Sequence, residues 1–181
     1  LMKGLGMSDA HGRARMVGDA HQYSLVERNI EDEICELCQN EGLGLTPWGP
    51  LGGGFLSGKY QPGEKPNDGR LSMMPDETEE AWHRRAIERN WNILQVVDEI
   101  AKAHQATHSQ IALAWSMRQP AVSSVIMGVR TLAQLDDNLA ASQVALTDED
   151  LERLDQVSKL EERYPYRFIE QYGFRNPNPE G

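Results

Sequence analysis

Residues 46–60 read TPWGPLGGGFLSGKY and follow directly on a short apolar run, GLGL, at residues 42–45. The apolar run predicts a buried strand, and the three glycines after it predict a turn in which backbone amides can approach a ligand closely. Phosphate-binding turns use this property, and Lys59 could add a positive charge. Trp48, at the end of the strand, could stack on a heterocyclic ring. The alternative is a tight strand-to-helix connection with a core tryptophan, because the stretch is neither G-x-G-x-x-G nor a Walker sequence.

The composition of the chain is that of an ordinary globular protein. Its 181 residues are 39% hydrophobic and 25% charged, which is enough for one sizeable core. The net charge of −10 argues against a nucleic-acid partner, since phosphate backbones need a basic protein face. No apolar run approaches the roughly 20 residues of a transmembrane helix, and two cysteines do not make the disulfide framework of a secreted protein. We therefore expect a cytoplasmic protein without a nucleic-acid or membrane partner.

Strands and helices are expected to alternate along the chain. Short apolar or β-branched runs predict strands within residues 14–20, 43–46 and 122–128. Alternation of this kind predicts an α/β protein with a parallel sheet that is buried on both faces. Residues 61–80 are expected to form a long polar loop and residues 164–181 an irregular tail.

The helices between these strands carry recognisable end signals. Apolar periodicity predicts a helix over residues 81–104, with Ile87 on its buried stripe. Gly42 is expected just after the end of another helix, over residues 30–41. Further helices are expected over residues 109–119, 131–141 and 147–160, with Ser109, Thr131 and Thr147 as their N-caps.

A second polar stretch, VIMGVRTLAQLDDNLAA, covers residues 125–141. A strand is expected to end at Gly128 and a helix to begin close to Thr131, so Arg130 lies where a cation and helix-start amides can share one anion. Gln134 and Asn138, with Asp137 beside them, share a helix face that could hydrogen-bond a purine. The more common alternative is a solvated polar helix face.

The sequence offers no metal or redox motif. Cys35 and Cys38 form a C-x-x-C inside an expected helix, whereas zinc needs about four ligands and redox pairs usually sit at a helix N-terminus. We interpret both cysteines as structural. The five histidines are scattered and have no metal-binding spacing, so no metal is expected.

Three stretches together resemble one family, the aldo-keto reductases. TPWGPLGGGFLSGKY is similar to the segment at their seventh barrel strand, GVRTLAQLDDNLAA to their eighth strand and following helix, and QYSLVERNIEDE to their sixth strand. The resemblance implies a (β/α)₈ barrel of the TIM type, which typically needs about 250 residues. The chain starts at Leu1, within an apparent helix. We therefore expect a single domain over residues 1–181 that corresponds to a truncated, C-terminal portion of such a barrel, with about three strands.

The resemblance also implies a cofactor site for NADP(H), with NAD(H) as the alternative. Trp48 would stack on the nicotinamide, and Arg130 would suit the 2′-phosphate of NADP, because a guanidinium binds phosphate well. The family usually has a glutamine that holds the nicotinamide carboxamide, at the position of Ala20 in this chain, and Gln22 would take its place. Gly49 stands where the family often has serine. The remaining implied residues are Pro50, Leu51, Gly53 and Lys59 near the pyrophosphate, and Gly128, Gln134, Asp137 and Asn138 near the adenosine.

The implied function is reduction of aldehyde or ketone carbonyls by an NADP(H)-dependent oxidoreductase. The family's catalytic Asp, Tyr, Lys and His belong to earlier strands, so no catalytic residue is assigned in this chain, and the 181 residues alone are not expected to reduce carbonyls. Alternatives are a non-catalytic nucleotide-binding or regulatory subunit and an inactive truncated fragment. The expected partners are a small-molecule carbonyl substrate and, through open sheet edges, a second copy of the chain.

Overall fold

The computed structural model describes residues 1–161 and 163–172. Its first elements are α1 (Met2–Ala10), β1 (Gly18–Asp19), η1 (Asn29–Asp32), α2 (Ile34–Glu41), β2 (Gly44–Leu45) and η2 (Gly52–Ser57). They are followed by α3 (Arg70–Met73), α4 (Trp82–Arg85), α5 (Glu88–His104), α6 (His108–Met117), α7 (Leu132–Leu139), η3 (Ala140–Gln143), α8 (Asp148–Ser158) and α9 (Tyr166–Tyr172).

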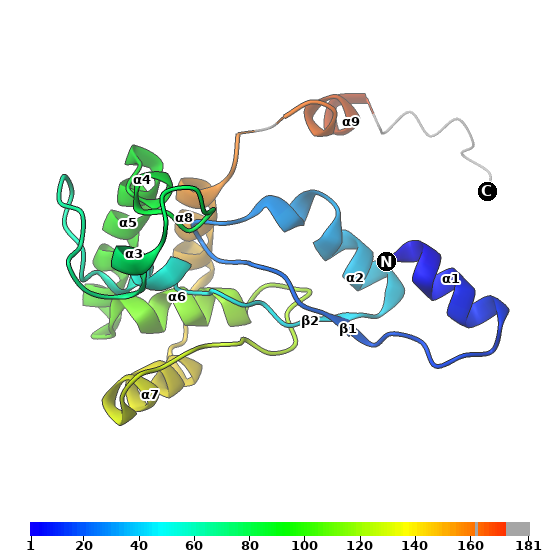
Figure 1. The fold of residues 1–181 in the computed structure, drawn as a ribbon, viewed down its shortest axis with the longest axis horizontal. Helices are drawn as coiled ribbons and strands as arrows, with labels where there is room; N and C mark the ends of the chain where they lie inside the picture. Colours follow the sequence, from blue (N-terminus) through cyan, green and yellow to red (C-terminus); the bar gives the residue numbers. More distant parts are fainter. Residues whose placement is uncertain (162, 173–181) are drawn as a thin grey trace.

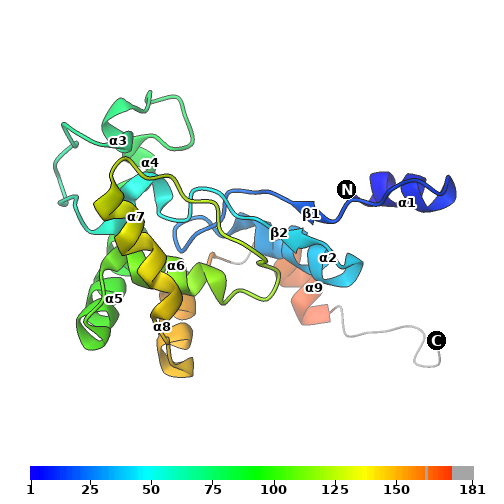
Figure 2. The same ribbon diagram turned by 90° about the horizontal axis from the view of Figure 1, so that it is seen from below.

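Helices α3 to α8 gather at one end of the molecule, and α1 lies at the opposite end with the strands between them (Figure 1). The view turned by 90° shows the same separation (Figure 2). Helices α5, α6 and α8 pack on one another in the helical end, where Ile100, Trp115 and Leu154 are fully buried. Burial of such large apolar side chains is the main favourable term for folding. The helical end therefore holds the centre of the core.

The strands form a small parallel sheet, as predicted. β1 pairs with β2, and the pairing continues as a parallel bridge between Gln22 and Trp48. A third segment runs on the other side of β2, through parallel bridges of Leu45 with Val122 and of Trp48 with Ile126. Three chain segments therefore run in the same direction, and their carboxyl ends meet at one edge of the sheet.

The expected strand over residues 122–128 is irregular. Ser123 donates to the carbonyl oxygen of Leu45, but the next ladder bond comes from Ile126 to the carbonyl oxygen of Pro47. Between these two hydrogen bonds, this segment advances by three residues, from Ser123 to Ile126, while the opposing segment advances by two, from Leu45 to Pro47. One extra residue of this kind is a β-bulge. The prediction of a continuous strand was wrong because this extra residue interrupts the ladder.

The prediction that the sheet is buried on both faces was also wrong for the described residues. Leu43 and Leu45 enter the core on one face of the sheet. Trp48 is 40% exposed and Ile126 is 50% exposed. The position of Trp48 on the face opposite Leu45 follows from the alternation of side chains along a strand. One face of the sheet is therefore covered by the core and the other is open.

Most helix ends follow their local sequence signals. Gly42 ends α2 in the left-handed conformation with φ of 67°, and Thr131 and Thr147 cap α7 and α8. The expected cap of α6 was wrong. Thr107, not Ser109, accepts from the backbone N–H of Gln110, and the Gln110 side chain completes a capping box.

The helix expected over residues 81–104 is broken into α4 and α5. Ile87 has an extended backbone, and the side-chain amide of Asn90 donates to the carbonyl oxygen of Arg85 at 2.9 Å. The break lets Trp82 pack against Tyr60 and Phe55, at ring-centroid distances of 5.5 and 6.4 Å. Ile87 lies in this break and is exposed, contrary to the prediction.

The expected loop and tail both contain short helices. α3 lies within residues 61–80, and α9 lies within the segment predicted to be irregular. The hydroxyl of Tyr166 in α9 donates to Glu33 at 2.6 Å, which ties α9 to the start of α2. Residue 162 and the part of the tail from residue 173 onward lie outside the described residues.

Candidate cofactor-binding site

A cavity of about 610 Å³ lies at the carboxyl ends of β2 and of the third segment. Its volume is in the range of small-molecule sites, and the carboxyl edge of a parallel sheet is where such folds bind ligands. The structure brings eleven of the twelve predicted residues together in its lining. These are Trp48, Gly49, Pro50, Leu51, Gly53, Lys59, Gly128, Arg130, Gln134, Asp137 and Asn138.

Gly53 and Gly54 of the glycine run line this cavity, and packing requires glycine at positions 52 and 53. Gly52 and Gly53 have φ values of 58° and 70°, a region that side chains disfavour. A Cβ at Gly52 would lie 2.7 Å from Val26, and one at Gly53 would lie 2.9 Å from Leu71. The run therefore turns the chain sharply against its neighbours, which agrees with the tight turn expected from the sequence, and the binding of a ligand by its backbone stays a prediction.

Gly128, on the facing wall, is different. A Cβ placed there would meet no heavy atom within 4 Å. Gly128 nevertheless lines the cavity. Its missing side chain therefore leaves open volume on this wall rather than relieving a clash.

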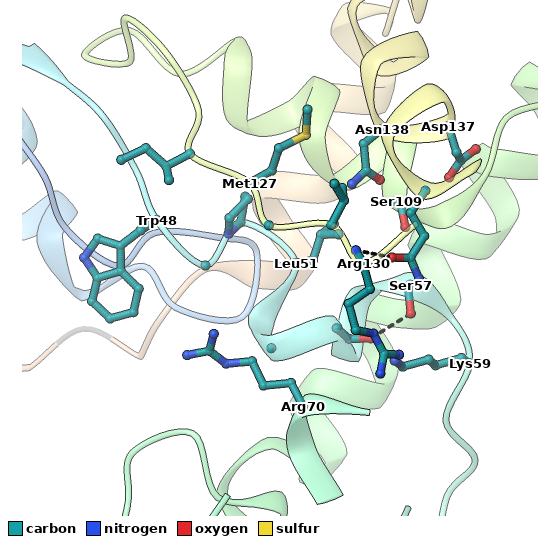
Figure 3. A pocket seen from close by; sticks show the side chains of 18 of the residues that line it. Trp48, Leu51, Ser57, Lys59, Arg70, Ser109, Met127, Arg130, Asp137 and Asn138 are labelled. Carbon is teal, nitrogen blue, oxygen red and sulfur yellow. Dashed lines mark hydrogen bonds between the residues drawn. The ribbon is translucent and has the colours of Figure 1, made fainter. Parts of the chain in front are cut away.

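Trp48 presents its ring to the open face of the sheet and to the cavity (Figure 3). Its backbone is fixed against residues 21–23, because its N–H donates to the carbonyl oxygen of His21 and its carbonyl oxygen accepts from the N–H of Tyr23. Such a large, half-exposed aromatic ring on a fixed backbone is a ready stacking surface for a planar ligand.

Three cations enter the cavity from different elements: Lys59 after η2, Arg70 in α3 and Arg130 before α7 (Figure 3). Arg130 forms an ion pair of 3.7 Å with Asp68, and both side chains are exposed, so this pair contributes little. The ammonium group of Lys59 lies 4.9 Å from the centroid of the Tyr60 ring. The lining also contains the carboxylates Glu80 and Asp137, so three cations against two anions leave it with a formal charge of +1 on a chain of net charge −10. This local excess of positive charge suits an anionic ligand.

The first turn of α7 is arranged around Arg130. The backbone N–H of Arg130 donates to the side-chain oxygen of Gln134 at 2.9 Å, and Thr131 caps the helix beside it. Asn138 follows one turn later and is buried in the lining. The polar face predicted for this helix thus faces the cavity rather than bulk solvent alone.

Asp137 lines the cavity, but its carboxylate is already hydrogen-bonded. It accepts from the hydroxyl of Thr107 at 3.0 Å and from the side-chain amide of Gln110 at 2.8 Å. Both donors belong to the N-terminal end of α6. No local sequence pattern indicates this pairing, because the partners are 27 and 30 residues apart along the chain.

Gln22 is the one predicted residue outside the cavity lining. Its side chain lies beside Gly49, since a Cβ at Gly49 would be 3.6 Å from the Gln22 Cγ. Its buried amide nitrogen has no hydrogen-bond partner in the structure. Gln22 therefore flanks the Trp48 end of the cavity and retains an unused donor there.

Sequence reasoning missed several lining residues. Arg70 and Glu80 come from the expected polar loop and pair with each other, with Arg70 Nε and Nη2 donating to Glu80 at 3.0 and 2.8 Å. Their only signal in the sequence was the length and charge of that loop. The other lining residues not predicted are Gly54, Ser57, Met73, Ser109, Ile126, Met127 and Val129.

The two cysteines lie in α2, outside this cavity. Cys38 is fully buried, and burial raises the pKa of its thiol. Burial and the neighbouring Glu31 raise the pKa of Cys35 to about 11. Both groups are therefore thiols near neutral pH, in agreement with a structural interpretation.

This pKa predicts slow chemical modification. At pH 8, alkylation of Cys35 by iodoacetamide should be about 200-fold slower than that of an unfolded control, because the thiolate is the nucleophile and an unperturbed cysteine has a pKa of about 8.5. Mass spectrometry of tryptic peptides over time would measure both rates, with the urea-unfolded protein as control. Equal rates in the folded and unfolded protein would contradict the raised pKa.

Among the described residues, no helix is both long and apolar enough to cross a bilayer. Within the same residues, no group of three or more His, Cys, Asp or Glu side chains could hold a metal ion.

Comparison with known proteins adds a family match. The model of the Aldo/keto reductase family matches residues 5–159. Probable aldo-keto reductase 1 of Glycine max is 35% identical over 133 residues, which are 74% of this chain and 37% of that protein. Protein tas of Escherichia coli (strain K12) is 31% identical over 160 residues, which are 88% of this chain and 45% of that protein.

A third relative carries a different kind of name. Probable voltage-gated potassium channel subunit beta of Arabidopsis thaliana is 32% identical over 147 residues, which are 80% of this chain and 44% of that protein. The chain thus spans less than half the length of these curated relatives. The match extends over both halves of the cavity, since residues 5–159 include every residue of its lining.

Proposed function

Since the chain belongs to the aldo/keto reductase family, we propose that it supplies the cofactor-binding part of an NADP(H)-dependent oxidoreductase that reduces aldehyde and ketone carbonyls. The family fold is a (β/α)₈ barrel, and the α/β arrangement with a partial parallel sheet fits a portion of one. The observation that carries the proposal is the single cavity that gathers the glycine run, the exposed Trp48 ring and three cations.

The residues fit a dinucleotide in type and in order along the cavity. Trp48 would hold the nicotinamide by stacking, with the free amide donor of Gln22 beside it. Lys59 and the glycine-run backbone would hold the pyrophosphate, and Arg130 the 2′-phosphate. Gln134 and Asn138 would lie against the adenosine. When bound, the nicotinamide supplies a hydride, while the residues of this chain bind and orient it.

Fluorescence tests this assignment. NADPH should quench tryptophan emission of the purified protein, and Trp48→Phe should remove most of the quenching, because Trp48 is the tryptophan in the cavity lining. Trp91→Phe is the matched control, because Trp91 does not line the cavity and its ring packs against that of Phe55, with 4.7 Å between the ring centroids. Equal quenching of the wild type and Trp48→Phe would contradict the site, and absence of NADPH binding would contradict the function.

A second candidate is a nucleotide-binding regulatory subunit without catalysis. The observation that favours it is the similarity to the relatives named as potassium channel subunits beta, at 32% identity for Arabidopsis thaliana and 36% for Schizosaccharomyces pombe. We assign no catalytic residue in this chain under either candidate. Turnover of 4-nitrobenzaldehyde with NADPH by the 181 residues would contradict the non-catalytic candidate. Both candidates allow absence of turnover in a chain without assigned catalytic residues, so the first is tested fully on a protein that also contains the family's earlier strands.

A further inference from the structure

We propose that Thr107 and Gln110, at the start of α6, are positioning residues that set the adenosine half of the cofactor site by holding Asp137. The inference rests on the proposed function, because it assigns the two residues a role in the same cavity. Neither residue lines that cavity. Their effect would therefore be transmitted through α7 and not through contact with the ligand.

The contacts form a closed set around Asp137. The Thr107 hydroxyl and the Gln110 amide donate to the two carboxylate oxygens, and the Gln110 amide is also 3.1 Å from the Asp137 carbonyl oxygen. The same two side chains make the capping box of α6, in which Gln110 accepts from the backbone N–H of Thr107 at 3.1 Å. One polar cluster thus ends α6 and fastens α7 to it.

The same turn of α6 also touches the opposite wall of the cavity. A Cβ at Gly58 would lie 2.9 Å from the His108 ring, so His108 packs directly against the end of η2. Ser109 contributes to the cavity lining itself. Four consecutive residues, Thr107 to Gln110, therefore connect the glycine run on one side with α7 on the other.

This arrangement gives Asp137 a role that differs from direct contact with a purine. Because both carboxylate oxygens already accept hydrogen bonds from α6, the carboxylate fixes where α7 lies. Arg130, Gln134 and Asn138 are carried by the start and the first turns of that helix. A shift of α7 would move all three, whereas Trp48 at the other end of the cavity belongs to the sheet.

The variant Gln110→Glu separates helix capping from positioning. Glutamate at this place in a capping box still accepts from the Thr107 backbone, so α6 keeps its cap. The amide donor to Asp137 is lost, and two carboxylates would face each other across a distance that is now 2.8 Å. The double variant Gln110→Glu with Asp137→Asn supplies an amide donor from the other side and should restore the hydrogen bond.

The readout uses the two halves of the cofactor as separate probes in calorimetric titrations. Gln110→Glu should weaken binding of 2′,5′-ADP about tenfold, in keeping with the loss of a hydrogen bond to a charged group. Binding of reduced nicotinamide mononucleotide should change by less than about twofold on the same scale. The double variant should recover most of the loss. Gln95→Glu, on the exposed face of α5, is the control and should leave both affinities unchanged.

The outcomes are distinguishable. If the wild type binds neither NADPH nor 2′,5′-ADP, the proposed function fails. If the wild type binds both and Gln110→Glu binds 2′,5′-ADP equally well, the positioning role fails while the function stands. Equal weakening of both probes, or no recovery in the double variant, would also overturn the positioning role. Circular dichroism confirms that each variant is folded before its affinities are compared.

Discussion

Replacing Arg130 with alanine should weaken NADPH binding about 30-fold, because a charge-assisted hydrogen bond to phosphate contributes about 1.5–3 kcal/mol. Arg130 lies in the connection before α7, and its backbone is held by Gln134 at 2.9 Å. Its distant ion pair with Asp68 leaves the guanidinium available to a ligand. NADH lacks the 2′-phosphate, so its affinity should fall by less than about threefold. Titration of both cofactors against both proteins measures the selectivity.

A matched arginine provides the control for this experiment. Arg13 is exposed between α1 and β1 and does not line the cavity, so Arg13→Ala changes the net charge equally without touching the site. An equal loss of NADPH affinity in the two variants would attribute the effect to overall charge. An equal loss of NADPH and NADH affinity in Arg130→Ala would place Arg130 at a phosphate that both cofactors share.

Replacing Trp115 with alanine should lower the free energy of unfolding by about 3–5 kcal/mol, the usual cost of truncating a buried aromatic side chain to alanine. Trp115 is fully buried in α6, where its ring lies 5.4 Å from Tyr23 and 5.2 Å from the guanidinium of Arg28. Its indole N–H donates to Asp155 at 3.0 Å. The substitution would leave a cavity and remove the aromatic partner of a buried cation. Urea denaturation followed by circular dichroism measures the change.

Trp115→Phe serves as the graded control. Phenylalanine keeps most of the ring contacts and loses the hydrogen bond to Asp155, which should cost about 1–2 kcal/mol. A loss in Trp115→Ala no larger than that in Trp115→Phe would show that packing around Trp115 contributes little. It would also show that α6 is not the centre of the core.

Local sequence signals predicted most helix ends, apart from the cap of α6, which is Thr107 and not Ser109. Gly42, Thr131 and Thr147 end or begin helices where expected, because a cap is formed within about four residues. The break at Ile87 and the bulge before Ile126 were missed. Both arise from tertiary packing: α4 turns so that Trp82 joins an aromatic cluster, and the third segment adjusts its register to β2.

The candidate site likewise has a part that the sequence predicts and a part that depends on tertiary packing. Residues 48–53 and 128–138 gather because each stretch follows a strand of one parallel sheet, so their meeting could be predicted from the order of the elements. The presence of Arg70 in the cavity lining could not be predicted, because it depends on the conformation of a loop in which Arg70 pairs with Glu80. The hydrogen bonds from Asp137 to α6 depend on how two helices dock, which no local pattern encodes.

Gly128 carries a consequence for how this pocket can change in evolution or in the laboratory. The glycines at 52 and 53 are closely surrounded by neighbouring atoms, whereas a Cβ at Gly128 would meet no heavy atom within 4 Å. A larger residue at this one position can therefore be added without a clash, next to the cavity that Gly128 lines. Under the proposed function, position 128 is where a substitution can change cofactor affinity while the fold is kept, whereas a side chain at position 52 or 53 would disturb the fold itself.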